Sequence, residues 1–191
     1  MGDTQHVEPA SPLPRPRTSF IGREREVAEA GCLLASDDVA LLTLTGPGGV
    51  GKTRLALQAA ASAAGAFPDG VAFASLASVA DPRLVLREIA QALGIQDAGN
   101  QPIAGALVGW LRGRAMLLVL DNLEHVIEVA PEIAGLLDAC PRLTILAASR
   151  VPLRVSAEHE FQVASLTLPE RVDSASLDVA NRSSAIELFV E

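Results

Sequence analysis

A glycine-rich stretch that ends in a lysine and a threonine is the feature of this sequence with the clearest chemistry. Residues 46–53, GPGGVGKT, fit the pattern G-x-x-x-x-G-K-[ST]. Glycines let successive backbone N–H groups turn inward around an anion, and the helix that follows directs its positive end at the same phosphates. Lys52 would contact the β- and γ-phosphates, and the Thr53 hydroxyl would bind Mg²⁺. The expected nucleotide-binding residues are Gly46, Pro47, Gly48, Gly49, Val50, Gly51, Lys52, Thr53 and Arg54.

Lys52 also stands out by composition. It is the only lysine among the 15 basic residues of the chain, and the rest are arginines. Drift toward arginine and alanine in a GC-rich genome explains why lysine is scarce, but it does not explain where the remaining one lies. The planar fork of arginine is larger and geometrically more demanding than an ammonium group. Retention of lysine at this position therefore favours a phosphate contact.

Two carboxylates follow a second apolar run. Residues 116–121, MLLVLD, place Asp121 at the end of a predicted strand in the form of a Walker B motif, where it would orient Mg²⁺. Asp121 is also a suitable N-cap for a following helix, and the two roles are compatible. Glu124 is the nearest carboxylate that could orient an attacking water, although the helix dipole alone favours Glu in a first turn. His125 is expected on the surface.

A cation follows a third apolar run. Arg150 comes directly after residues 143–149, at the carboxyl end of a predicted strand, where ligands bind in open α/β sheets. There it could sense a γ-phosphate. The alternative is a solvated arginine at the end of a strand.

These residues need a scaffold that brings strand ends together. Apolar runs of five to seven residues alternate with segments of helical spacing, which predicts an α/β fold with a parallel sheet. The predicted strands are 39–45, 71–76, 115–120, 143–149 and 161–166. Helices are predicted over 52–64 and 102–112. Another is capped by Asp81, and its buried face comprises Leu84, Leu86, Ile89, Ala90 and Leu93. A fourth follows Asn122 and ends near 140–141, with Pro131 as a point where it could break.

Composition excludes several classes of function. A net charge of -8 leaves no broad basic face, so this segment is not expected to bind nucleic acid directly. The absence of a long apolar run argues against a membrane span, and Cys32 and Cys140 lack the spacing of a zinc site or disulfide framework. Both cysteines are expected as small core residues of a cytoplasmic protein. Residues 1–19 are rich in proline and predict a tail or linker.

Taken together, residues 20–26, the phosphate loop, 118–125 and 146–153 resemble the STAND class of P-loop ATPases. They are most similar to the NB-ARC-like domain of large bacterial regulators of the LuxR and antibiotic-regulator types. The resemblance implies a three-layer P-loop NTPase fold with five mostly parallel strands in the order 2-3-4-1-5. It also implies an adenine pocket near Ile21, Gly22 and Arg23, with Lys52, Asp121, Glu124 and Arg150 as catalytic or phosphate-sensing residues. The nucleotide-binding domain would be 20–168, and 169–191 would be a linker and the start of a truncated helical lid.

Members of this class act as switches in which ADP holds a closed form and ATP promotes opening and self-association. The resemblance therefore implies ATP or ADP with Mg²⁺ as ligands and a DNA-binding domain elsewhere in a longer chain. Many relatives carry a second acid where this chain has Asn122, so slow or no hydrolysis is expected. The alternatives are a turnover ATPase of the AAA+ or origin-binding kind, a small-molecule kinase, and an inactive remnant of a larger protein.

Overall fold

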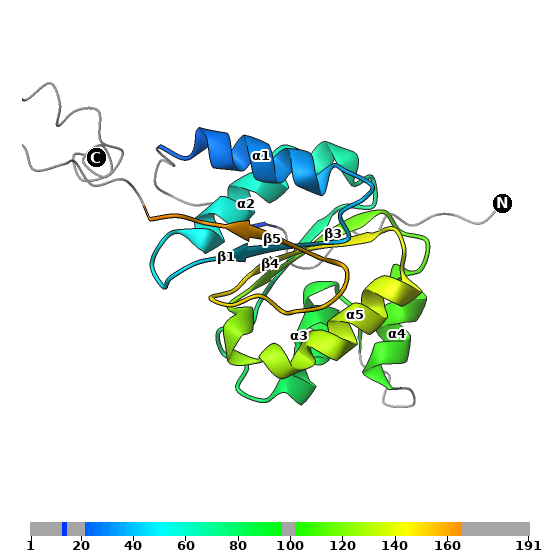
Figure 1. The fold of residues 1–191 in the computed structure, drawn as a ribbon. Helices are drawn as coiled ribbons and strands as arrows, with labels where there is room; N and C mark the ends of the chain where they lie inside the picture. Colours follow the sequence, from blue (N-terminus) through cyan, green and yellow to red (C-terminus); the bar gives the residue numbers. More distant parts are fainter. Residues whose placement is uncertain (1–12, 15–21, 97–101, 166–191) are drawn as a thin grey trace, which may run out of the picture.

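The central element is a sheet of five parallel strands in the order β2-β3-β4-β1-β5 (Figure 1). The computed structural model describes residues 13–14, 22–96 and 102–165. The strands are β1 (Leu41–Thr45), β2 (Val71–Ser75), β3 (Met116–Asp121), β4 (Leu143–Ala148) and β5 (Glu158–Gln162). The α/β class and the strand order are as the sequence and its family resemblance predicted. β4, which precedes Arg150, lies between β1 and β3.

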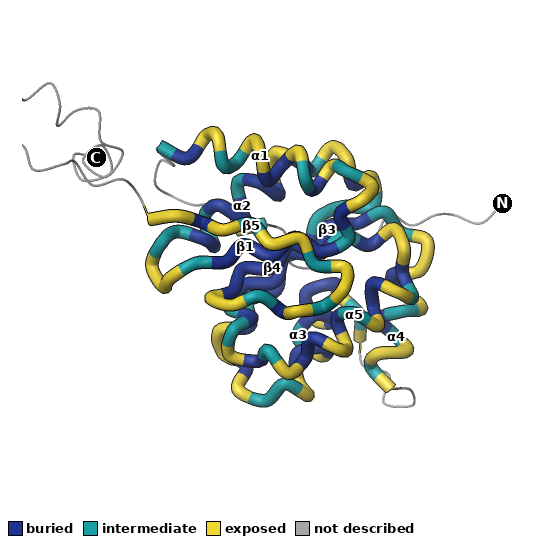
Figure 2. Tube along the Cα trace, in the orientation of Figure 1, coloured by how far each residue is buried: buried dark blue, intermediate teal, exposed yellow. Residues whose placement is uncertain are grey.

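Helices cover both faces of this sheet and complete three layers. On one face lie α1 (Glu24–Leu34) and α2 (Lys52–Ala63), and on the other α3 (Val85–Ala92), α4 (Ile103–Leu111) and α5 (Ala130–Ala139) (Figure 1). Side chains of β3 alternate between the two cores, since Leu118 packs with the α3–α5 side and Leu117 with the α1–α2 side. Strands covered on both faces have to be apolar throughout, and every residue of β1 and β3 is buried (Figure 2).

Short 3₁₀ turns connect several of these elements: η1 (Ala64–Ala66), η2 (Pro82–Leu84), η3 (Leu123–His125) and η4 (Ile127–Val129). Asp81 caps η2 as predicted, because its side chain accepts a hydrogen bond from the backbone N–H of Arg83. Leu84, however, is 44% exposed rather than buried, since the 3₁₀ turn rotates it away from the face that α3 buries.

The segment after β3 corrects another prediction. A continuous helix was expected after Asn122, but η3 and η4 occupy residues 123–129 and α5 begins only at Ala130. Pro131 does not interrupt a helix; it lies in the first turn of α5, where its missing N–H costs no hydrogen bond.

The last strand lies earlier than predicted. β5 spans Glu158–Gln162, whereas the sequence prediction was 161–166. As an edge strand it borders only β1, and its side chains are exposed or half-buried, so charged residues are tolerated there and the apolar signal is weak. The helix α1 was not predicted at all, because it buries only Ala30, Gly31 and Leu34.

Of the two cysteines, Cys140 is buried as expected and Cys32 is exposed on α1, which corrects its placement in the core. The predicted boundaries after residues 19 and 168, and the linker and helical lid predicted over 169–191, lie outside the described residues. None of the helices in the described part of the chain combines the length and apolar character that a bilayer crossing requires.

Candidate phosphate-binding site

The glycine-rich loop joins the end of β1 to the first residue of α2, as its motif predicted. Two glycines are required by its geometry. A Cβ at Gly46 would lie 2.7 Å from the carbonyl oxygen of Val163, and Gly51, which caps α2, has φ of 94°. The backbone can therefore turn tightly against the end of β5 and open into a helix N-terminus, which is the arrangement that binds phosphates.

The Lys52 side chain folds back over this loop. It is only 8% exposed, and its Nζ donates hydrogen bonds to the carbonyl oxygens of Gly46 at 2.8 Å and Pro47 at 3.0 Å. A buried ammonium requires such acceptors. The charge is thus held at the mouth of the loop by the loop's own backbone.

Asp121 and Thr53 meet across the same site. Thr53 Oγ1 donates a hydrogen bond of 2.8 Å to Asp121 Oδ1. Asp121 is 7% exposed, and burial raises the pKa of its carboxyl group although the bonds from Thr53 and the Asn122 backbone act in the opposite direction. A hydroxyl and a carboxylate at this separation form a suitable oxygen donor pair for Mg²⁺.

Asp121 is not a helix cap. It is the last residue of β3, and the position before η3 is occupied by Asn122 at φ of 62°, with no capping bond from its side chain. Of the two roles left open by the sequence, the geometry retains the one in which the carboxylate faces the loop. Within the described residues, no group of three or more His, Cys, Asp or Glu side chains is placed to hold a metal ion.

Arg150 and Glu124, predicted independently, form an ion pair. Arg150 Nε donates to Glu124 Oε1 at 3.1 Å, with 58% of the arginine side chain and 10% of the glutamate side chain exposed. The guanidinium lies over the loop, because a Cβ at Gly48 would be 3.4 Å from Arg150 Cζ. Glu124 is therefore engaged by a cation in this structure and is not a free carboxylate.

These groups surround a cavity of about 230 Å³ at the carboxyl ends of the strands. Its lining comprises Gly48, Gly49, Gly51, Lys52, Thr53, Arg54, Asp121, Asn122, Glu124, Ala148 and Arg150. Strand ends of β1, β3 and β4 thus bring together most of the residues singled out by the sequence.

The expected adenine pocket is placed only in part. Ile21 lies outside the described residues, and Arg23 is buried, with its Nη2 donating to the carbonyl oxygens of Val50 at 3.0 Å and Ala164 at 2.8 Å. Its Nη1 also pairs with Glu26 at 3.2 Å. Arg23 thereby ties the phosphate loop to the chain just after β5. Gly22 precedes it, and an adenine contact by either residue stays a prediction.

Two acidic residues of β5 were missed by the sequence interpretation. Glu160 accepts a hydrogen bond of 2.6 Å from Thr45 Oγ1, immediately before the phosphate loop. Glu158 binds backbone N–H groups of the loop that follows Arg150. The sequence signal that could have located this strand is the alternation of Glu158 and Glu160 in residues 158–162, EHEFQ. Charged residues in a strand are typical of the edge of a sheet.

The strand order, the glycine-rich loop between β1 and α2, and the carboxylate at the end of β3 define a P-loop nucleoside triphosphatase domain. Comparison with known families makes this assignment narrower. A family model described as "AAA domain" matches residues 37–162, and the chain belongs to that family.

The chain is also similar to bacterial regulators. It is 39% identical over 143 residues to a "Putative HTH-type transcriptional regulator" of Mycobacterium tuberculosis, a match that covers 74% of this chain and 16% of the relative. It is 33% identical over 216 residues to the regulatory protein AfsR of Streptomyces coelicolor, covering 98% of this chain and 22% of AfsR. The chain thus spans less than a quarter of the length of either relative.

Solved structures support the fold alone. Drosophila ORC bound to DNA superposes with a TM-score of 0.58 at 17% identity, covering 75% of this chain and 43% of that one. Cdc6p from Pyrobaculum aerophilum gives a TM-score of 0.57 at 17% identity, covering 80% and 47%.

Proposed function

We propose that this chain is a Mg²⁺-dependent ATP/ADP-binding switch module, of the STAND and NB-ARC type, from a signal-responsive transcriptional regulator. The observation that carries the proposal is the juxtaposition of buried Lys52 with the hydrogen-bonded pair Thr53 and Asp121 beside one phosphate loop. Its similarity to longer regulators supports the signalling context.

Each residue has a distinct task in this proposal. Backbone N–H groups of the loop and the start of α2 bind the phosphates, while the Lys52 ammonium exchanges its bonds to two loop carbonyls for phosphate oxygens. Thr53 and Asp121 supply the protein oxygens for Mg²⁺, which when bound neutralises phosphate charge. Both oxygens are already oriented toward each other.

In this proposal Arg150 distinguishes ATP from ADP. Its guanidinium lies over Gly48 and is bonded to Glu124 through Nε, so its remaining N–H groups can approach a terminal phosphate. A switch requires contacts that one nucleotide makes and the other does not. A γ-phosphate bound to Arg150 would provide that contact, and ADP would not.

Hydrolysis is slow or absent in this proposal. Glu124, the candidate for orienting water, is paired with Arg150, and Asn122 occupies the position where many relatives have a second acid. A carboxylate oxygen that accepts a hydrogen bond from a guanidinium is not free to orient an attacking water. The chain would therefore hold a nucleotide rather than turn it over.

The partners follow from charge and context. A net charge of -8 disfavours direct contact with nucleic acid, so DNA recognition is assigned to other domains of a longer protein. Nucleotide-dependent self-association is the expected output of the switch.

Two measurements on the chain test the proposal, calorimetry and thermal unfolding. Each is made with ATP, ADP and GTP, with and without Mg²⁺. We expect ATP and ADP to raise the melting temperature in a Mg²⁺-dependent way, because a ligand that binds only the native state stabilises it. Rapid release of phosphate would instead support a turnover ATPase of the AAA+ kind. No binding of any nucleotide would favour an inactive remnant.

A further inference from the structure

The loop after β4 is held by a carboxylate of the edge strand β5, the next strand along the chain. Glu158, the first residue of β5, accepts hydrogen bonds from the backbone N–H of Leu153 at 2.8 Å and of Arg154 at 2.7 Å, one to each carboxylate oxygen. Hydrogen bonds to an ionised acceptor are roughly twice as strong as neutral ones. The backbone they hold is unusual, since Arg154 has φ of 59°.

Two further anchors fix the same loop. Ser149 Oγ accepts a hydrogen bond of 3.3 Å from the Val151 N–H, and the Leu153 side chain, 5% exposed, belongs to the core on the α3–α5 side of the sheet. Arg150 lies between these anchors. The loop conformation is therefore specified on both sides of the guanidinium-bearing residue.

Arg150 itself receives little packing from its surroundings. Its side chain is 58% exposed, and it is held over the phosphate loop by the ion pair with Glu124 and by the backbone that carries it. An exposed arginine has many rotamers, and its position over Gly48 depends on where its Cα is held. The bonds that fix the backbone on either side of Arg150 therefore determine whether its guanidinium can reach Glu124 and the phosphate loop together.

We propose that Glu158 is a positioning residue that clamps the loop after β4 so that Arg150 stands over the phosphate loop and favours a nucleoside triphosphate over a diphosphate. This inference rests on the proposed function of the site. Glu158 acts through Arg150 and touches no phosphate. It thereby links the edge strand β5 to the discrimination between the two states of the switch.

A double-mutant cycle tests this role. Affinities for Mg²⁺-ATP and Mg²⁺-ADP are measured by calorimetry on the full chain for wild type, Glu158→Ala, Arg150→Ala and the double variant. We expect Glu158→Ala to reduce the ratio of ATP to ADP affinity by roughly tenfold, and to have no further effect on that ratio when Arg150 is already alanine. His159→Ala, an exposed change on the same strand, is the matched control and should leave the ratio unchanged.

A merely structural role would lower the melting temperature without changing the ratio, or would change it equally in both backgrounds, and either result overturns the inference. Should Glu158→Ala fail to fold, Glu158→Gln keeps one acceptor oxygen and should shift the ratio in the same direction by less; an unchanged ratio there overturns the inference as well. A wild-type chain that binds neither nucleotide refutes the proposed function, and the inference with it. Binding of both nucleotides with a ratio insensitive to Glu158 refutes the inference alone.

Discussion

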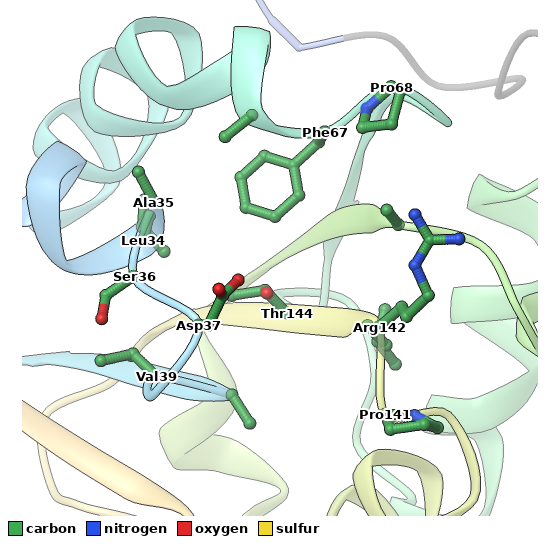
Figure 3. Close-up of a pocket in the computed structure, with 14 residues that line it drawn as sticks. Leu34, Ala35, Ser36, Asp37, Val39, Phe67, Pro68, Pro141, Arg142 and Thr144 are labelled. Carbon is green, nitrogen blue, oxygen red and sulfur yellow. The ribbon is translucent and has the colours of Figure 1, made fainter.

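The two ends of the sheet both carry a cavity, but they differ in chemistry. At the amino-terminal ends of the strands a cavity of about 370 Å³ lies between the end of α1, Phe67 and the start of β4 (Figure 3). The cavity at the carboxyl ends has only about 230 Å³. Size alone would therefore select the wrong end for phosphate chemistry.

Charge and backbone direction separate the two ends. At the carboxyl end, a glycine-rich loop leads into the N-terminus of α2, and Lys52 and Asp121 are buried beside it. At the amino end, α1 finishes at Leu34 and its C-terminal carbonyls carry negative partial charge, next to Asp37. The first end therefore favours anions, whereas the second, although larger, offers the C-terminus of α1 and an Asp37 carboxylate whose charge is matched by Arg142.

The largest expected effect is loss of the Lys52 ammonium. Lys52→Ala should abolish the thermal stabilisation by Mg²⁺-ATP and weaken its affinity by about a hundredfold or more, because a charge-assisted contact to phosphate is lost. Lys52→Arg should recover little, since the guanidinium does not fit the space of an ammonium between two loop carbonyls. Thermal shift titration measures both variants. An undiminished shift in Lys52→Ala would refute the assignment of the carboxyl-end cavity.

The second prediction concerns the buried carboxylate. Asp121→Asn should weaken Mg²⁺-dependent ATP binding by about tenfold or more while raising the melting temperature of the nucleotide-free chain. Burial raises the pKa of the Asp121 carboxyl group. At pH values above that pKa the native state buries a negative charge that the unfolded state exposes to water, and this lowers the free energy of unfolding. Asparagine removes this cost and can still accept a hydrogen bond from Thr53.

The pH dependence of stability provides the control for Asp121→Asn. As pH falls from neutrality through the raised pKa, the wild-type chain should gain stability relative to the variant, because protonation relieves the buried charge. Chemical unfolding at several pH values, without nucleotide, measures the difference. A constant difference across that range would contradict the burial argument.

The buried strands of the sheet could be predicted from the sequence, whereas the edge strand β5 and the contacts around it could not. Strands β1 and β3 are buried throughout, and β4 is buried at every residue except Thr144, so their apolar runs predicted them. The loop motif predicted the positions of Lys52 and Thr53. The position of β5 was wrong because an edge strand needs no continuous apolar run. The bond from Arg23 to the Ala164 carbonyl joins residues far apart in the chain, and the bonds of Glu158 depend on loop backbone geometry. Neither leaves a local pattern to recognise.

A smaller effect is expected from releasing Arg150. Glu124→Gln removes the negative charge that holds the Arg150 guanidinium, so a γ-phosphate no longer competes with a carboxylate for it. We expect ATP affinity to rise by about twofold to fivefold, and ADP affinity to change less. Competition binding with a fluorescent nucleotide measures the two affinities. A marked loss of ATP affinity would show instead that Glu124 contributes directly to binding.

The smallest effect is expected at the amino end of the sheet. Arg142 lines the larger cavity, is exposed, and donates a hydrogen bond of 2.8 Å to the Gly113 carbonyl. Arg142→Ala should lower stability by about 0.5 kcal/mol or less, as is typical of surface positions, and should leave ATP and ADP affinities unchanged. Calorimetry measures the ATP and ADP affinities of Arg142→Ala and Lys52→Ala side by side. Each variant removes one cation from one end of the sheet, so the two ends are compared directly. Equal losses of nucleotide affinity would mean that a general positive potential, rather than the loop geometry, binds the phosphates.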